Sequence, residues 1–184
     1  MRLTPSFFDR NTVQVARDLL GKFLVRRQGQ SVIAAKIIET EAYCGQSDLA
    51  CHASKGLTPR TKILFGPPGH TYIYLIYGMY YCLNFVTRKP GQPEAVLIRA
   101  VDLLGADGPG KLTRAFKIDR SLNDLPPDNT ELWIEDPAPR RILVRGKPSW
   151  VWSKTPRSRI KATKRIGVEY AGPWASKLWR FVLK

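Results

Sequence analysis

The stretch TYIYLIYGMYYCLNFVT, residues 71–87, does most to set the fold expected for this chain. Two β-prone runs, 71–76 and 80–87, flank Tyr77-Gly78-Met79, and a short glycine-containing interruption between two such runs is typical of a β-hairpin. We therefore predict an antiparallel hairpin with an exposed tyrosine, Tyr77, at its tip. Because side chains alternate along a strand, Tyr74 and Tyr77 are expected on opposite faces.

Further β-prone and helical patterns surround this hairpin. Strands are predicted at residues 22–26, 31–43, 94–103, 132–135, 142–145 and 179–183, and short helices between Asn11 and Gly21 and at residues 109–116. Residues 22–26 and 31–43 are separated by Gln-Gly-Gln and should form a second hairpin. Together these elements predict an α+β fold, a single compact domain over residues 1–184 with a curved, largely antiparallel β-sheet.

One strand of the second hairpin carries an unusual set of side chains. With strict alternation, one of its faces holds Ile37, Glu39, Glu41 and Tyr43. Two carboxylates beside an aromatic ring are not what a hydrophobic core requires, so we expect this face to belong to a site. The connection that follows, residues 44–70, is long and rich in glycine and proline, and such connections usually serve a function.

The charge balance indicates polyanionic partners. The chain of 184 residues has 30 Lys and Arg against 15 Asp and Glu, a formal net charge of +15. Basic residues are dense from Pro137 to Lys184, which suggests a basic face for nucleic acid or an anionic membrane. A solvated surface tuned for solubility is the alternative, and charge alone names no reaction.

Compartment is indicated by what the sequence lacks. It shows no run of 18 apolar residues and no secretory signal at its start. Its cysteines are odd in number, which fits reduced thiols. We expect an intracellular protein, in the cytoplasm or nucleoid of a prokaryote or the nucleus of a eukaryote.

Two segments resemble a known family, the alkyladenine (3-methyladenine) DNA glycosylases. They are IIETEAY, residues 37–43, and YIYLIYGMYYCLN, residues 72–84. Further agreement occurs in ACH (50–52), TPR (58–60), VLIRA (96–100), GPGKL (108–112), RIGV (165–168) and AGPW (171–174). Matching segments in the same order are more specific than any short motif, and the resemblance runs nearly end to end, weakest between Ile118 and Lys161.

The resemblance implies a monofunctional DNA glycosylase that hydrolyses the bond between a damaged purine and deoxyribose. It assigns the general base to Glu41 and gives Arg99 the task of helping to hold the attacking water. A glutamate with an ordinary pKa of about 4.3 is already ionised at neutral pH and can accept the proton of that water. The alternative reading is a structural Glu–Arg ion pair.

The same resemblance implies a pocket for a nucleotide flipped out of the duplex. Tyr43 and Tyr74 would stack on the two faces of the purine, with His52 against its edge, and the backbone N–H of His52 would donate to an adenine-like lesion. Asn84 would crowd the exocyclic amino group of guanine. On the residues alone, tyrosines at this spacing are more often core or sheet surface, and Asn84 could be an ordinary sheet residue.

Tyr77 matches the position that intercalates into DNA in this family. An aromatic wedge in the space left by the flipped nucleotide opposes its return. The implied partner is double-stranded DNA that contains damaged purines. The protein is expected to be a monomer and not to bind a membrane.

A metal or nucleotide cofactor is not expected. Cys44, Cys51, His52 and Cys82 fit the spacing of no common zinc module. Residues 66–69 lack the Lys-Ser/Thr ending of a phosphate-binding loop.

Several points stay open at this stage. The sequence leaves undecided the balance among 3-methyladenine, 7-methylguanine, hypoxanthine and ethenoadenine, the DNA contacts within residues 118–161, and whether Ile166 or Val168 supplies a backbone carbonyl to the water. Two other functions are also compatible with it. One is a non-catalytic nucleic-acid-binding module, which would have no use for Glu41, and the other is a different hydrolase on a related scaffold.

Overall fold

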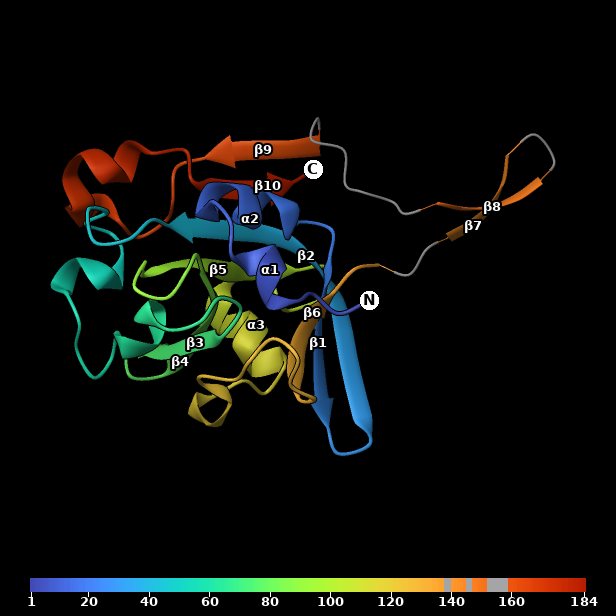
Figure 1. Cartoon of the computed structure of the whole chain (residues 1–184), viewed down its shortest axis with the longest axis horizontal. Coiled ribbons are helices and arrows are strands. Elements are labelled where there is room, and N and C mark those ends of the chain that lie inside the picture. The colour runs from blue at the N-terminus through green and yellow to red at the C-terminus, as the bar shows by residue number, and fades with distance from the viewer. Residues whose placement is uncertain (138–139, 145–146, 152–158) are drawn as a thin grey trace.

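The computed structural model describes residues 1–137, 140–144, 147–151 and 159–184 (Figure 1). Its strands are β1 (Phe23–Gln28), β2 (Ser31–Tyr43), β3 (Thr71–Ile76), β4 (Tyr80–Thr87), β5 (Glu94–Val101), β6 (Leu132–Glu135), β7 (Arg140–Val144), β8 (Lys147–Val151), β9 (Ile160–Thr163) and β10 (Arg180–Leu183). Its helices are α1 (Pro5–Phe8), α2 (Thr12–Asp18) and α3 (Pro109–Ala115), with 3-10 turns η1 (His52–Lys55), η2 (Lys62–Phe65), η3 (Arg120–Leu122) and η5 (Glu169–Ser176).

Eight of the strands form one curled sheet in which neighbours are antiparallel. The order along it is β3-β4-β5-β2-β1-β6, and β10 pairs with both β2 and β9. β7 and β8 pair only with each other among the described strands. The α+β class and the curved antiparallel sheet are thus confirmed.

The strands of the two hairpins agree closely with the prediction. β3 and β4 have the predicted bounds, and β1 and β2 pair from Phe23↔Lys36 to Gln28↔Ser31. β5 is shorter than predicted, since it ends at Val101, and β8, β9 and α1 were not predicted. The turn of the 71–87 hairpin has left-handed φ at Tyr77 (+50°) and Gly78 (+69°), which gives the tight reversal that joins twisted antiparallel strands.

The main core lies on one face of the sheet. Side chains of α2, such as Val15 and Ala16, and of α3, such as Leu112, join the sheet residues Val96 and Ile98 in one buried cluster. Asn11 caps α2 by accepting a hydrogen bond from the N–H of Gln14 (3.2 Å), as its position predicts. Residues that alternate with Val96 and Ile98, such as Arg99, face the other side of β5.

β2 does not keep strict alternation, and this corrects one prediction. Its register against β5 shifts between Ile37 and Glu39 and again between Glu39 and Thr40, the mark of a β-bulge. Ile37 is consequently fully buried in the main core together with Ala42, although one has an odd and the other an even number. Strict alternation placed Ile37 on the same face as Glu39, Glu41 and Tyr43. The structure places it on the opposite face.

The bulge divides β2 into two parts with different tasks. Before it, the strand pairs with β1 and contributes to the core; after it, Thr40 fixes the strand to α2 by donating to the carbonyl of Ala16 (2.8 Å). Because the bulge resets which residues face outward, the carboxylates of Glu39 and Glu41 lie together on the face of the sheet away from the main core, both beside Arg99.

Candidate active site

Glu41 is a fully buried carboxylate at the centre of this second face. Its Oε2 accepts a hydrogen bond from the hydroxyl of Tyr43 (2.8 Å), and its Oε1 accepts one from the backbone N–H of Ile166 (2.9 Å). The Nη1 atom of Arg99 lies 3.5 Å from Oε1. Burial raises the pKa of Glu41 above its ordinary value, while Arg99 and the N–H of Ile166 act in the opposite direction.

Arg99 lies between the carboxylates of Glu39 and Glu41, and it is closer to that of Glu39, which is less buried. Its Nε donates to Oε1 of Glu39 at 2.9 Å. The same Oε1 also accepts from Nη1 of Arg180 at 2.9 Å, so Glu39 joins β5 and β10 across β2. Arg99 and Glu41, predicted to act together, are thus neighbours at a distance longer than an ordinary hydrogen bond.

A small pocket opens beside Glu41. Its lining residues are Tyr43, Ala50, Cys51, His52, Leu64, Tyr72, Tyr74, Asn84 and Ala95. Four of these, Tyr43, His52, Tyr74 and Asn84, are the residues that the sequence analysis assigned to a base pocket. Tyr43 belongs to both features, because its ring lines the pocket while its hydroxyl reaches Glu41.

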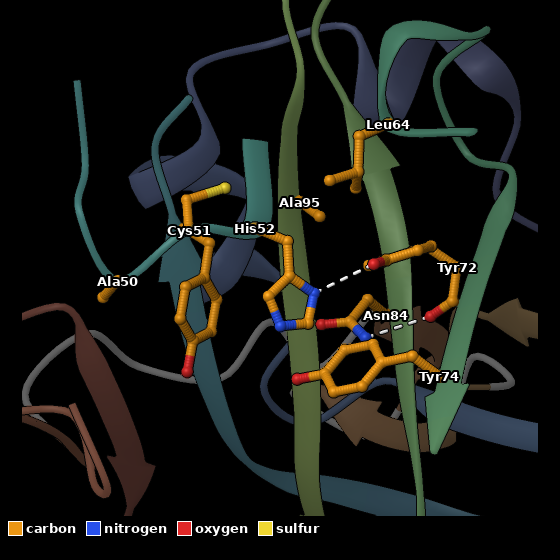
Figure 2. Close-up of a pocket in the computed structure, with 9 residues that line it drawn as sticks. Ala50, Cys51, His52, Leu64, Tyr72, Tyr74, Asn84 and Ala95 are labelled. Carbon is orange, nitrogen blue, oxygen red and sulfur yellow. Dashed lines mark hydrogen bonds between the residues drawn. The ribbon is translucent and has the colours of Figure 1, made fainter. Parts of the chain in front are cut away.

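Aromatic rings gather on one side of this pocket (Figure 2). The rings of His52 and Tyr74 are 4.5 Å apart at 66°, and those of Tyr72 and Tyr74 are 5.3 Å apart. Nδ1 of His52 is 2.9 Å from the hydroxyl of Tyr72. Burial and the neighbouring Arg60 lower the pKa of His52 to about 4, so its imidazole is neutral at physiological pH.

Asn84 lies on the floor of the pocket, nearly fully buried. Its amide nitrogen donates to the carbonyls of Tyr72 (3.0 Å) and Cys82 (3.4 Å). Because two carbonyls face the nitrogen, the amide oxygen must point the other way, and Figure 2 shows it on the side of His52. These two bonds fix the orientation of the side chain, and no pattern in the sequence predicts them.

Tyr77 lies apart from this pocket, at the turn between β3 and β4, and it is 85% exposed. Met79 beside it is also exposed. Tyr74 lines the pocket and Tyr77 is exposed, but Tyr77 lies in the turn beyond the end of β3, so strand parity does not set its direction.

A buried ion pair between Arg165 and Asp48, which no pattern in the sequence predicts, lies beside Tyr43. Nη1 and Nη2 of Arg165 bind Oδ2 and Oδ1 of Asp48 at 2.6 and 2.8 Å, with both side chains inaccessible to solvent. The guanidinium of Arg165 also lies 4.8 Å from the ring centre of Tyr43. Ile166, next in the chain, thereby meets Glu41 through its N–H; a carbonyl contact to water at residue 166 or 168 stays a prediction.

The cysteines lie near the pocket as neutral thiols. Burial raises the pKa of Cys51 and of Cys82 to about 11, and it raises that of Cys44 further. Within the described residues no group of three or more His, Cys, Asp and Glu side chains is arranged to hold a metal ion.

Two predicted features, the basic segment and the end of one strand, include residues that the structure does not describe. The basic segment beyond Pro137 includes residues 138–139, 145–146 and 152–158, which lie outside the described residues, as does the predicted strand end at Arg145.

In the part of the chain that is described, no helix is both long and apolar enough to cross a membrane.

An aromatic pocket beside a buried carboxylate, in a chain of formal net charge +15, is the combination expected of an enzyme that acts on a base of a nucleic acid. Comparison with known proteins agrees. The family model for methylpurine-DNA glycosylase (MPG) matches residues 6–107 and 104–184.

Similar proteins are found in bacteria and archaea. A Legionella pneumophila (strain Paris) protein is 45% identical over 189 residues, which cover 100% of this chain and 94% of the relative. One from Methanocella arvoryzae is 46% identical, covering 97% and 90%, and one from Anaeromyxobacter dehalogenans (strain 2CP-C) is 47% identical, covering 100% and 84%. Each is named "Putative 3-methyladenine DNA glycosylase". The chain belongs to the methylpurine-DNA glycosylase family, and is thus a DNA-repair enzyme for alkylated bases.

Proposed function

We propose that this protein flips alkylated or deaminated purines out of duplex DNA and releases them by hydrolysis, leaving an abasic site. The observation that carries the proposal is that Tyr43 lines the pocket while its hydroxyl donates to the buried carboxylate of Glu41. A base held in that pocket would bring its glycosidic carbon, C1′, towards Glu41. The family membership and the names of the relatives support the same reaction.

In the proposed reaction a water molecule attacks C1′ while Glu41 accepts its proton. The O–C1′ bond forms, the bond from C1′ to the base nitrogen breaks, and its electron pair leaves with the base. A purine alkylated at N3 or N7 is cationic in the nucleotide and departs as a neutral base. A neutral lesion such as hypoxanthine departs as an anion, which takes up a proton from solvent. Arg99, 3.5 Å from Oε1 of Glu41, would help to hold the water.

Burial of Glu41 is what separates this proposal from a binding module without catalysis. Removing an ionised carboxylate from water costs free energy, and only two hydrogen bonds to Glu41 are made by the described residues, from Tyr43 and Ile166. A protein that only binds a polyanion gains nothing from such a group. A general base with a raised pKa, by contrast, accepts a proton more readily at neutral pH.

The pocket residues have distinct proposed roles. Tyr43 would stack on one face of the purine and Tyr74 on the other, with the neutral ring of His52 against the edge. The amide oxygen of Asn84, fixed by the two carbonyls that its nitrogen binds, would crowd the exocyclic amino group of guanine. Tyr77, exposed at the hairpin tip, would fill the space that the flipped nucleotide leaves.

The test is a labelled duplex with one damaged purine, incubated with the protein and cleaved with alkali at any abasic site. Duplexes with hypoxanthine, ethenoadenine, 7-methylguanine and 3-methyladenine define the lesion range. Cleavage at the lesion is expected for at least one of them. Tight binding of every duplex without any abasic site would favour the binding module instead.

Flipping is tested separately with Tyr77→Ser. Because a wedge stabilises the flipped state only against the stacked duplex, the variant should lose more single-turnover rate with hypoxanthine opposite thymine than with hypoxanthine in an unpaired bulge. Melting curves provide the control. Equal losses in both contexts together with a large fall in melting temperature would mean that Tyr77 only packs the hairpin.

A further inference from the structure

Glu39 holds two arginines with a single carboxylate oxygen. Its Oε1 accepts from Nε of Arg99, on β5, and from Nη1 of Arg180, on β10, each at 2.9 Å. The three side chains are 13 to 23% exposed, so solvent screens these contacts only in part. β2, which carries Glu39, lies between the other two strands.

Arg180 extends this contact towards Glu41 by a second route. Its Nε donates to Oγ1 of Thr163 (2.9 Å) and to the carbonyl of Lys164 (3.0 Å). Two residues further along the chain, Ile166 donates its N–H to Glu41. Two routes therefore connect Glu39 with Glu41. One passes through Arg99, and the other passes through Arg180 and residues 164–166.

The geometry of Arg99 shows what Glu39 prevents. An arginine free to turn its whole fork towards a buried carboxylate forms two short bonds, as Arg165 does with Asp48 at 2.6 and 2.8 Å. Arg99 instead spends its Nε on Glu39 and leaves Nη1 at 3.5 Å from Glu41. A bidentate pair with Arg99 would occupy the oxygens that a general base needs for the proton of water.

We propose that Glu39 is a positioning residue, which keeps Arg99 close enough to Glu41 to orient water but too far to neutralise it. This role rests on the proposed function of Glu41 as general base. Glu39 touches neither substrate nor water in this scheme, and acts through Arg99. Charge at Glu39 and the reach of its side chain both contribute, and they can be separated by substitution.

The pH profile of excision reports the role, because it follows the ionisation of Glu41. The titratable and charged groups around that carboxylate are Glu39, Tyr43, Tyr74, Cys82, Arg99 and Arg165. Glu39 raises the pKa of Glu41 and Arg99 lowers it. Removing the charge of Glu39, and letting Arg99 approach, both lower the pKa of Glu41, so the acidic limb of the profile should move to lower pH.

The experiment measures single-turnover excision between pH 4.5 and 9 on a duplex that the wild-type protein cleaves. Glu39→Gln is expected to lose about tenfold at the plateau, with its acidic limb at lower pH. Glu39→Asp keeps the charge but shortens the reach, so it should lose rate with the limb near its wild-type position. Glu131→Gln, which removes the exposed partner of Arg26, is the matched control and should change neither quantity.

The outcomes are distinct. If Glu39→Gln has a wild-type plateau and an unmoved limb while Glu41→Gln is inactive, the positioning role is overturned and the proposed function stands. If Glu39→Gln does not fold, wild-type rates in Glu39→Asp overturn the role in the same way. If the wild-type protein excises no lesion, the proposed function fails, and this role with it.

Discussion

Two buried carboxylates, Asp48 and Glu41, each face an arginine, and they do so in different ways. Asp48 accepts from both terminal nitrogens of Arg165 and from the backbone N–H groups of Cys44 and Ala50 at 2.6 to 3.1 Å. A carboxylate has about four acceptor sites, so Asp48 is saturated. Glu41 accepts two hydrogen bonds from the described residues and has its arginine at 3.5 Å.

The same chemical group therefore has two tasks in this protein. A saturated pair at short distances has no capacity left for a substrate, and it ties the loop after β2 to the segment after β9. An unsaturated carboxylate held beside a cation at a longer distance costs stability but can still accept a proton. Breaking each pair in turn should therefore affect different measurements.

The largest effect is expected from Asp48→Asn. The amide cannot accept on both atoms, so Arg165 would be left buried and only partly compensated, which typically costs about 3–5 kcal/mol. For a chain of this size that is a fall in melting temperature of about 10 °C. Differential scanning calorimetry measures it.

Asp18→Asn is the matched control for that variant. Asp18 forms a half-exposed pair with Arg10 at 3.0 Å, and exposed pairs contribute about 0–1 kcal/mol. Equal falls in melting temperature for the two variants would show that the buried pair is not what holds the pocket together.

Glu41→Gln should give the opposite pattern, a loss of activity without a loss of stability. Excision is expected to fall by at least about 100-fold, as for loss of a general base, while affinity for lesion DNA is kept. Single-turnover assays and binding titrations measure the two quantities. Wild-type rates in this variant would remove Glu41 from the mechanism.

The difference in melting temperature between Glu41→Gln and wild type should depend on pH. Because the pKa of Glu41 is raised in the folded protein, its ionisation weakens the fold as pH rises through that value. Gln has no charge to bury, so at pH values above the raised pKa of Glu41 the variant should melt at a higher temperature than wild type. Below the unfolded pKa of 4.5 the advantage should vanish; a gain that persists there would mean that the charge is not its cause.

How far the sequence predicts these features depends on how local they are. The hairpin of residues 71–87 could be predicted because alternation and Gly78 are local signals, and both strands have the predicted bounds. The bulge in β2 could not, since it depends on pairing with β5, and Ile37 was therefore placed on the wrong face.

The candidate site divides in the same way. Glu41, Arg99 and the pocket residues came from matching segments, and the fold brings them together. The pairing of Asp48 with Arg165 spans 117 positions, and the two arginines on Glu39 come from strands far along the chain. Neither alternation nor composition carries information about such contacts, and only the folded sheet shows that one carboxylate is saturated while the other is not.

Tyr43→Phe should change activity least, and it tests the hydrogen bond to Glu41 directly. The ring that lines the pocket is kept, and only the hydroxyl that donates to Glu41 at 2.8 Å is removed. That bond lowers the pKa of Glu41, so the pKa should rise in the variant and the acidic limb of excision should move to higher pH. This is opposite to the shift expected for Glu39→Gln. Loss of one hydrogen bond, about 0.5–1.5 kcal/mol, limits the change in plateau rate to about 2- to 10-fold. Tyr43→Phe and Glu39→Gln should be measured on the same substrate. If a step other than the ionisation of Glu41 set the pH profile, the acidic limbs of both variants would move in the same direction. If both limbs move in the same direction, the pH profile does not report the ionisation of Glu41, and its unsaturated carboxylate is not the proton acceptor that sets the rate.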